Sequence, residues 1–335
     1  MQVVMPGLGF STDIRSFLAT GKAGSLLSPD STKNAPFETR PLFSMQPTNC
    51  NQKGEVGCMD ERDKNQMLGT PTGFTEVDKL LRGLCGGNLI ILAARPGVGK
   101  TTFALNVATN AAKSGATVVF FSLETSGDDV AKRTLCSEAR VSLRRMRQGN
   151  LQEGERHAIA NAADALSGLE LYVDDYPALS LPEMRAKAHR LLRDKKKGLV
   201  IVDYLQLVPP PSNCHDGSRA VELTEILCGL KVLAKEMGIP VLALSNLHFP
   251  YGEGRIERPT LFDLRKLGPF EQVADIVMFI YRPKDAIEAE INGNGEPETA
   301  ELIVAKHHYG PTCDITLTFN PEYARFDNRN ETSNM

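Results

Sequence analysis

The segment ARPGVGKTT, residues 94–102, has the composition of a loop that binds phosphate groups. It matches the pattern G-x-x-x-x-G-K-[ST], except that Ala94 replaces the first glycine. The glycines would let successive backbone N–H groups point at phosphate oxygens, and the helix that follows would add its positive N-terminal dipole. We predict that a nucleotide binds to Gly97, Val98, Gly99, Lys100, Thr101 and Thr102.

Two residues of this loop would have specific roles in such a site. Lys100 would reach the β and γ phosphates of ATP, and the Thr101 hydroxyl would bind Mg²⁺. The alternative is a glycine-rich turn that only caps a helix. The strand-like run before the loop and the helical pattern after it favour the nucleotide site.

Binding of the metal requires a second strand that carries a carboxylate. Asp203 follows the apolar residues LVIV, near the carboxyl end of an expected buried strand, where ligands bind in open α/β sheets. A buried aspartate without a partner would be costly, so we predict that Asp203 is linked to the ion. ATP and Mg²⁺ are therefore the expected cofactors.

Hydrolysis of ATP also requires a group that orients or activates water. Glu124, in the sequence SLET, follows an expected strand and could reach the γ phosphate from its tip. A glutamate at this position could equally cap the next helix. The residues alone leave both interpretations open.

The segment AKHHYGP, residues 305–311, places two histidines behind a lysine at the end of an apolar run. They could form a metal site, contact phosphate in an ATPase, or be two exposed strand residues. Adjacent strand residues face opposite sides, so His307 and His308 could not readily bind one ion, and no nearby cysteine completes a ligand set. The other two interpretations remain.

Short apolar runs alternate with helical patterns from residue 70 onward, which is typical of an α/β fold with a mostly parallel central sheet flanked by helices. Two further apolar runs, joined by a Gly-Pro turn, predict a C-terminal antiparallel hairpin over 299–308 and 313–321. The expected core strands are 88–94, 117–123, 199–207, 240–247 and 275–282, and the expected helices are 101–114, 128–140, 153–166, 181–195 and 220–237.

The composition is that of a soluble globular protein: 335 residues, 41% hydrophobic, 24% charged and a net charge of -3. No run approaches the roughly 20 apolar residues of a membrane span, and no secretory signal is recognisable. Seven cysteines lie without a C-x-x-C pair, which suits reduced thiols. We expect a cytoplasmic protein that does not associate with membranes.

The first 66 residues are rich in Ser, Pro, Asn, Thr and Gly and show no sustained apolar period. We expect a disordered polar tail over 1–66, one ATPase domain over 67–328 and a disordered C-terminus over 329–335.

Eight segments follow one another in the order PTGFTEVDKLLRGL, NLIILAARPGVGKTTFALNVA, VVFFSLETS, SEARVSLRRMRQG, LVIVDYLQL, LKVLAKEMGIPVLALSNL, RPTLFDLRKLGPFEQVADIVMFIYR and LIVAKHHYGPT. Together they resemble the C-terminal motor domain of the DnaB-type replicative DNA helicases of superfamily 4, over residues 70–328. Related recombinases and KaiC-type ATPases share the T-G-F-x-x-x-D start but do not usually carry V-D-Y-L-Q-L together with the later segments.

This resemblance implies a RecA-like P-loop core, a hexameric homo-oligomer, ATP hydrolysis at subunit interfaces, movement on single-stranded DNA and other replisome proteins as partners. It makes Glu124 the catalytic glutamate and Asp203 the magnesium-linked aspartate. Family members usually carry a helical N-terminal domain that contacts primase. A polar tail stands in its place here, so primase binding is not assumed.

Two further departures lie at positions where the family contacts the γ phosphate. Asn246 occupies the place of a glutamine and is one methylene shorter. In the family's K-x-R-x-G pattern, Lys306 and Gly310 match, but His308 replaces the arginine that reaches a neighbour's ATP. Histidine is shorter, lacks the bidentate fork and is mostly neutral near neutral pH.

The segment after Asn246 faces the DNA channel in the family. Arg255 and Arg258 are our candidates for contacts with DNA phosphates, and Phe249 and Tyr251 could stack on bases. A solvated loop whose aromatic residues pack locally is the alternative.

Two functions follow from these patterns. The first is an ATP-dependent helicase or translocase. The second is an ATP-binding relative that hydrolyses slowly, because Asn246 and His308 weaken the site, and acts as an assembly or regulatory partner.

Overall fold

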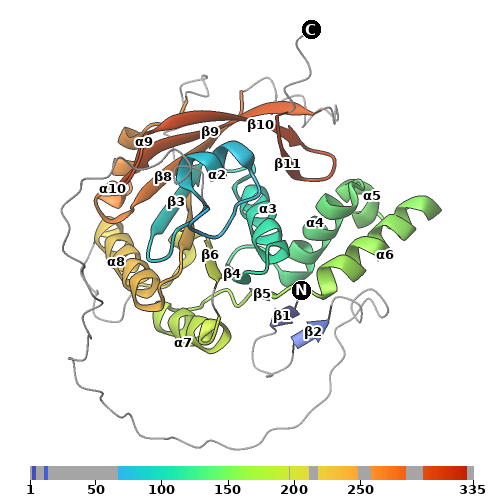
Figure 1. Ribbon diagram of the computed structural model, residues 1–335, viewed down its shortest axis with the longest axis horizontal. Helices are drawn as coiled ribbons and strands as arrows, with labels where there is room; N and C mark the ends of the chain where they lie inside the picture. The colour runs from blue at the N-terminus through green and yellow to red at the C-terminus, as the bar shows by residue number, and fades with distance from the viewer. Residues whose placement is uncertain are drawn as a thin grey trace, which may run out of the picture.

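An eleven-stranded sheet runs through the computed structural model, which describes residues 67–195, 197–210, 218–247, 258–283 and 297–329, together with the backbone of 2–4 and 11–13 (Figure 1). Six neighbouring strands are parallel and lie in the order β8-β3-β7-β6-β4-β5. Their bounds are β3 Leu89–Ala94, β4 Thr117–Ser122, β5 Leu171–Asp174, β6 Gly198–Asp203, β7 Val241–Asn246 and β8 Ile276–Tyr281.

Antiparallel strands extend the sheet beyond β8. There β9 (Glu298–His307), β10 (Cys313–Asn320) and β11 (Arg325–Asn328) pair in sequence. At the opposite edge, β1 (Gln2–Val4) runs parallel to β5, and β2 (Ser11–Asp13) pairs antiparallel with β1. The expected α/β fold with a mostly parallel sheet and a C-terminal hairpin is confirmed.

Helices cover both faces of the sheet (Figure 1). Ile90 and Leu92 of β3 pack with α3, α4 and α6, whereas Leu89 and Ile91 pack with α7 and α8. Both faces are therefore buried, which is why the strands read as continuous apolar runs. The helices are α2 Thr75–Leu81, α3 Lys100–Lys113, α4 Gly127–Ala139, α5 Leu143–Arg147, α6 Glu153–Ser167, α7 Leu181–Leu192, α8 Arg219–Met237, α9 Leu261–Arg265 and α10 Phe270–Val273.

Several expected boundaries differ from the structure. The strand expected over 199–207 ends at Asp203, because its pairing with β4 ends at Ser122, and 205–207 form the 3-10 helix η2 (Leu205–Leu207). Of the apolar residues in and after this turn, Leu205 and Val208 lie in the core, whereas Leu207 is exposed. The helix expected over 181–195 ends at Leu192.

The short elements β1, β2, β5, β11, α2, α5, α9 and α10 were not predicted, because each has too few residues to show a period. Two of them, β1 and β2, lie within the expected tail. Residues 1, 5–10, 14–66 and 330–335 lie outside the described residues, and disorder there remains a prediction.

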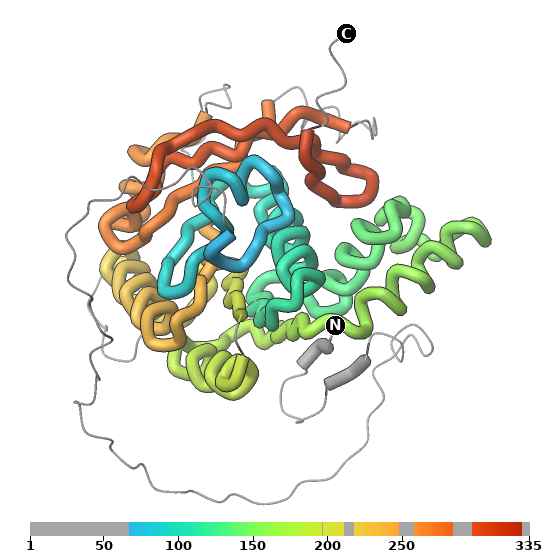
Figure 2. Tube along the Cα trace, viewed as in Figure 1, coloured from blue at the N-terminus to red at the C-terminus, as the bar shows by residue number. Residues whose placement is uncertain are grey.

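The C-terminal strands lie against the helices α2 and α3. Figure 2 shows β10 and β11 beside α2 and α3, which are far away in the sequence. Phe103 of α3 stacks on Phe74, with ring centroids 4.8 Å apart, and meets Phe326 of β11 edge-on at 5.6 Å. These aromatic contacts hold the C-terminal strands against the loop that precedes α3.

Candidate nucleotide-binding site

The predicted phosphate loop joins the end of β3 to the start of α3. Gly97 and Gly99 have φ angles of 79° and 109°, in the left-handed region that favours glycine. A Cβ atom on Gly99 would also lie 3.1 Å from Cζ of Phe326, so space as well as conformation restricts this position. Ala94, which replaces the first glycine of the motif, is the last residue of β3.

The Lys100 side chain is buried within this loop. Its ammonium donates to the backbone carbonyls of Ala94 and Arg95, each at 3.2 Å. Burial lowers the pKa of Lys100 to about 8, although the carboxylates of Asp203 and Glu124 oppose the change. A further negative group beside this ammonium, such as a phosphate, would favour its charged form and raise the pKa again.

Asp203 ends β6 and is 1% exposed. Burial raises the pKa of its carboxyl group to about 6, opposed by the Thr101 hydroxyl and by Lys100. Although Thr101 is close enough to lower this pKa, neither Asp203 oxygen completes a hydrogen bond among the described residues. A buried carboxylate in this state, beside a hydroxyl, fits a hard divalent cation such as Mg²⁺.

These groups surround one cavity of about 400 Å³. Gly97, Gly99, Lys100, Thr101, Thr102, Glu124, Asp203 and Asn246 line it, so the structure brings together the phosphate-loop, metal and water-activating candidates. Val98, the remaining predicted loop residue, is instead buried in the core.

Glu124 follows β4 at the edge of this cavity. The other interpretation of this residue was a cap for the next helix. The cap of α4 is instead Ser126, whose side chain accepts from the Asp129 N–H at 3.3 Å, while the Gly127 N–H donates to Asp175 at 2.7 Å. Glu124 is exposed and can face a ligand.

Sequence reasoning missed two parts of the cavity. Arg133 of α4 lines it and lowers the pKa of Asp203, and its Nε is buried without a hydrogen-bond partner among the described residues. Arg133 lies inside a helical segment and belongs to no recognisable sequence motif, so it could not be identified from the sequence. Phe319, near the end of β10, also lines the cavity, as do Pro321 and Ala324 of the turn that leads to the unpredicted strand β11.

Lys306 and His308 do not line this cavity. A shift in register leaves Ala305 unpaired in β9, so Lys306 lies opposite Val277. The Lys306 ammonium donates to the carbonyls of Glu271 at 2.5 Å and Ala274 at 2.6 Å, at either end of α10. It therefore joins β9 to α10 within one molecule.

His308 lies one residue beyond β9. The strand predicted over 299–308 therefore ends one residue earlier than expected, at His307. The His308 N–H donates to the Asp275 carbonyl at 2.9 Å, and the exposed ring meets Tyr309 edge-on at 4.5 Å. His307 turns to the Pro311 carbonyl, 3.2 Å from its Nδ1.

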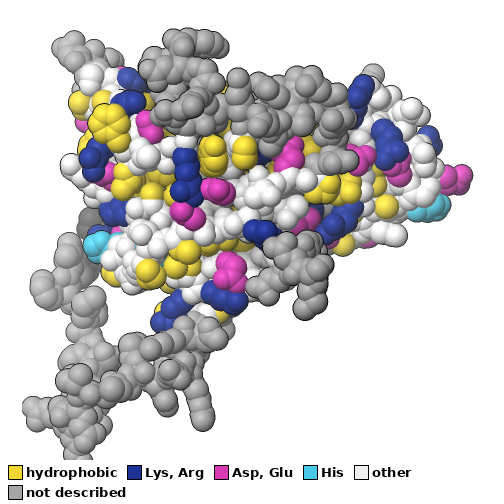
Figure 3. All heavy atoms as spheres, turned by 90° about the horizontal axis from the view of Figure 1, so that it is seen from above, with side chains coloured by type: hydrophobic (Ala, Val, Ile, Leu, Met, Phe, Trp, Pro, Cys, Tyr) yellow, Lys and Arg dark blue, Asp and Glu magenta, His cyan; other side chains and the backbone are white. Residues whose placement is uncertain are grey.

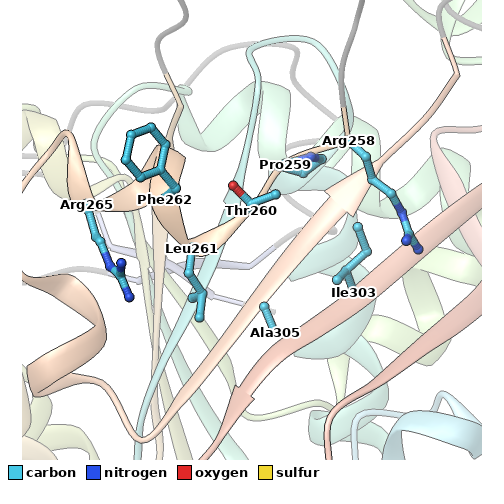
Figure 4. A pocket seen from close by; sticks show the side chains of 8 residues that line it. All are labelled: Arg258, Pro259, Thr260, Leu261, Phe262, Arg265, Ile303 and Ala305. Carbon is cyan, nitrogen blue, oxygen red and sulfur yellow. The ribbon is translucent and has the colours of Figure 1, made fainter.

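Arg258, a candidate for DNA contact, is occupied by two carboxylates. Its Nη2 lies 2.6 Å from Glu301 of β9 and 2.7 Å from Asp314 of β10. Figure 4 shows it at one end of an apolar pocket between α9 and β9, with Arg265 at the other. Arg255, Phe249 and Tyr251 lie outside the described residues.

The surface seen in Figure 3 mixes basic, acidic and hydrophobic side chains among the described residues. Within the part of the chain that the structure describes, no helix combines the length and apolar character that crossing a membrane would require.

Comparison with known proteins gives a consistent result. A family model described as the DnaB-like helicase C terminal domain matches residues 69–328. The chain is 40% identical over 266 residues to the replicative DNA helicase DnaC of Bacillus subtilis, and 42% identical over 273 residues to the replicative DNA helicase DnaB of Leifsonia xyli. These matches cover 79% and 81% of this chain but 58% of each relative. The chain thus spans less than two thirds of the curated relatives it matches.

Solved structures match over a similar range. One of them, described as an ATPase domain, has a TM-score of 0.73 at 31% identity, covering 81% of this chain and 94% of that chain. A DnaB-like replicative helicase, described together with its interactions with primase, has the same TM-score and identity, with 64% of its chain covered. The RecA-like fold expected from the sequence is confirmed.

Proposed function

Because the chain belongs to the DnaB-like helicase C-terminal domain family, we propose that it is an ATP-dependent motor that moves along single-stranded DNA. The observation that carries this proposal is the buried, unpartnered carboxylate of Asp203 beside Lys100 and Thr101 in one cavity of the described residues. Such a site suits a nucleotide with its magnesium ion.

Each residue of the site would act on the bound nucleotide through its own chemistry. The loop N–H groups and Lys100 would bind the phosphates, and Thr101 and Asp203 would hold Mg²⁺, which neutralises phosphate charge. Glu124 would accept a proton from the attacking water. Arg133 and Asn246, which also line the cavity, would contact the γ phosphate.

Hydrolysis would occur between subunits of a homo-oligomeric ring. This part of the proposal is supported by Lys306 and His308, which lie outside their own cavity and so could serve that of a neighbour. His308, exposed beyond the end of β9, would donate to the γ phosphate when protonated. Binding to single-stranded DNA, and to other replisome proteins, is proposed from the family.

A second candidate function is an ATP-binding relative with slow turnover. The observation that favours it is that the arginine finger's place holds a histidine whose side chain is short and exposed. Such a protein would bind ATP and assemble, but would not move efficiently.

Steady-state ATP turnover with and without single-stranded DNA tests both functions. The motor should show DNA-stimulated turnover that is lost in Glu124→Ala. The slow relative should show near-background turnover that rises in His308→Arg, because an arginine finger contributes about 10³ to 10⁵ in rate in other phosphoryl-transfer enzymes.

Lys100→Ala provides the matched background. Wild-type turnover equal to that of Lys100→Ala, with or without DNA, would overturn the motor. Size-exclusion chromatography with a non-hydrolysable ATP analogue tests the ring, and a persistent monomer would contradict it.

A further inference from the structure

We propose that Gln206 is a positioning residue, which holds the end of β7 so that Asn246 faces the nucleotide. This inference rests on the proposed function, since it assigns a role in hydrolysis at the same cavity. Gln206 itself does not line that cavity. Its role would be exerted through Asn246, which does.

The need for such a residue arises where the sheet ends. β6 and β7 pair only as far as Val202 and Ala243, and β6 ends at Asp203. β7 continues to Asn246, three residues beyond its last partner on that side. The last peptide groups of β7 therefore project past β6, and buried backbone groups need hydrogen-bond partners.

The Gln206 carboxamide takes the place of the missing strand. Its Oε1 accepts from the Asn246 N–H at 3.2 Å, and its Nε2 donates to the Asn246 carbonyl at 3.1 Å. The same Nε2 donates to the hydroxyl of the fully buried Ser245 at 2.9 Å. The two amide hydrogens and the oxygen of Gln206 therefore all form hydrogen bonds with two consecutive residues, Ser245 and Asn246.

A carboxamide suits this position because it presents a donor and an acceptor side by side, as a peptide group does. On the other side of β7, Asn246 lies beside Ala94 of β3, whose carbonyl accepts from Leu247 at 2.9 Å. Asn246 is therefore fixed between the phosphate-loop strand and Gln206. The backbone position of Asn246, from which its side chain reaches the cavity, therefore depends on both.

Gln206 is held in turn by the chain around it. Its carbonyl accepts from Nη2 of Arg219 at 2.8 Å, at the start of α8, and it lies in η2, directly after the strand that carries Asp203. The residue therefore connects the metal-binding strand with the strand that bears the γ-phosphate contact. A shift of one would be transmitted to the other.

Gln206→Met, which has similar volume but no hydrogen bonds, tests the proposal. We expect kcat of DNA-stimulated ATP turnover to fall about 10- to 100-fold, because small displacements of an active-site group have effects of that size. Affinity for a fluorescent ATP analogue should stay within about 2-fold, because Lys100 and Thr101 are untouched. Gln148→Met, at an exposed helix end, is the matched control.

A double-mutant cycle with Asn246→Ala separates positioning from general destabilisation. If Gln206 acts through Asn246, Gln206→Met should cause no further loss of kcat in the Asn246→Ala background. An unchanged kcat in the single variant would overturn the proposal, and so would an equal loss in both backgrounds.

Hydrogen exchange supplies a readout that does not depend on ATP turnover. In Gln206→Met, or in Gln206→Leu if the former does not fold, the backbone amide of Asn246 should exchange at least about 10-fold faster, because neither side chain can accept its hydrogen bond, while that of Leu244 is unchanged. Absence of turnover in the wild type would overturn the proposed function, whereas unchanged exchange at Asn246 would overturn the positioning role.

Discussion

The Lys306 ammonium lies 2.5 Å from the backbone carbonyl oxygen of Glu271. A second carbonyl, that of Ala274, is 2.6 Å away. An ammonium group has three protons, so this arrangement leaves one for another acceptor. The lysine that would reach a neighbour's ATP is thus also a structural link between β9 and α10.

Replacing Lys306 should therefore affect stability as well as turnover. Lys306→Met removes two charge-assisted hydrogen bonds, and we expect the free energy of unfolding, measured with urea, to fall by about 1–3 kcal/mol. Lys79→Met, which removes an exposed pair with Glu76, should change it by less than about 0.5 kcal/mol. If both variants change the free energy of unfolding by the same amount, the hydrogen bonds of Lys306 to the two carbonyls do not stabilise the fold.

The raised pKa of Asp203 predicts a pH-dependent effect of Asp203→Asn on the nucleotide-free protein. The folded state binds the Asp203 proton more tightly than the unfolded chain, so this residue destabilises the fold only when ionised. A rise in pKa from 3.8 to about 6 corresponds to roughly 3 kcal/mol. The variant should exceed the wild type in stability by about that amount above pH 6.

The advantage of Asp203→Asn should shrink as pH falls through 6 and vanish below about pH 4, where both forms are neutral. Urea unfolding of both proteins across this pH range measures the difference between their free energies of unfolding. The contributions of other titrating groups cancel in that difference. With Mg²⁺ and ATP present, the order should reverse, because only the wild type gains from the bound ion. A constant difference at all pH values would contradict the assignment.

Phe326 should be important for both the fold and the nucleotide loop. It is 2% exposed, and its ring lies 4.7 Å from that of Phe319 and beneath Gly99. Phe326→Ala should lower the free energy of unfolding by about 3–5 kcal/mol, as for other buried aromatic residues. It should also weaken ATP binding, measured by fluorescence titration.

Phe262→Ala is the control for Phe326, since Phe262 is 65% exposed and should change stability by no more than about 0.5 kcal/mol. Unaltered nucleotide affinity in folded Phe326→Ala would show that the loop does not depend on β11.

The carboxylates around Arg258 should compete with DNA phosphates for its guanidinium group. Asp314→Asn removes one competitor, so affinity for single-stranded DNA, measured by fluorescence anisotropy, should increase severalfold and depend more steeply on salt. Glu153→Gln, at an exposed position on α6, corrects for the general loss of negative charge. Equal affinities of the two variants for single-stranded DNA would show that Arg258 stabilises the hairpin of β9 and β10 and does not bind DNA.

The contiguous parts of the site could be predicted from the sequence. The phosphate loop is a local structure, in which a strand, two glycines, a lysine and a helix follow one another, so residues 94–102 specify it directly. Asp203 was identified in the same way, from an apolar run that must be a buried strand with a carboxylate at its end. The likeness of ordered segments supplied the role of Glu124.

The groups that the sequence did not reveal come from pairing between distant segments. Arg133 and the turn before β11 reach the cavity only because α4 and β11 pack beside α3. The hydrophobic periodicity of a single segment does not show such packing. Gln206 looked like part of a strand, and its role depends on where β6 stops relative to β7.

The residues themselves specify the chemistry of the site: the phosphate loop, the carboxylates at strand ends and a sheet covered on both faces. The direction in which Lys306 and His308 point depends instead on strand pairing. Because Ala305 has no partner in β8, the Lys306 side chain points towards α10. Because β9 ends at His307, the direction of His308 is not set by strand geometry. A register shift is set by the partner strand, so it is absent from any one segment of the chain.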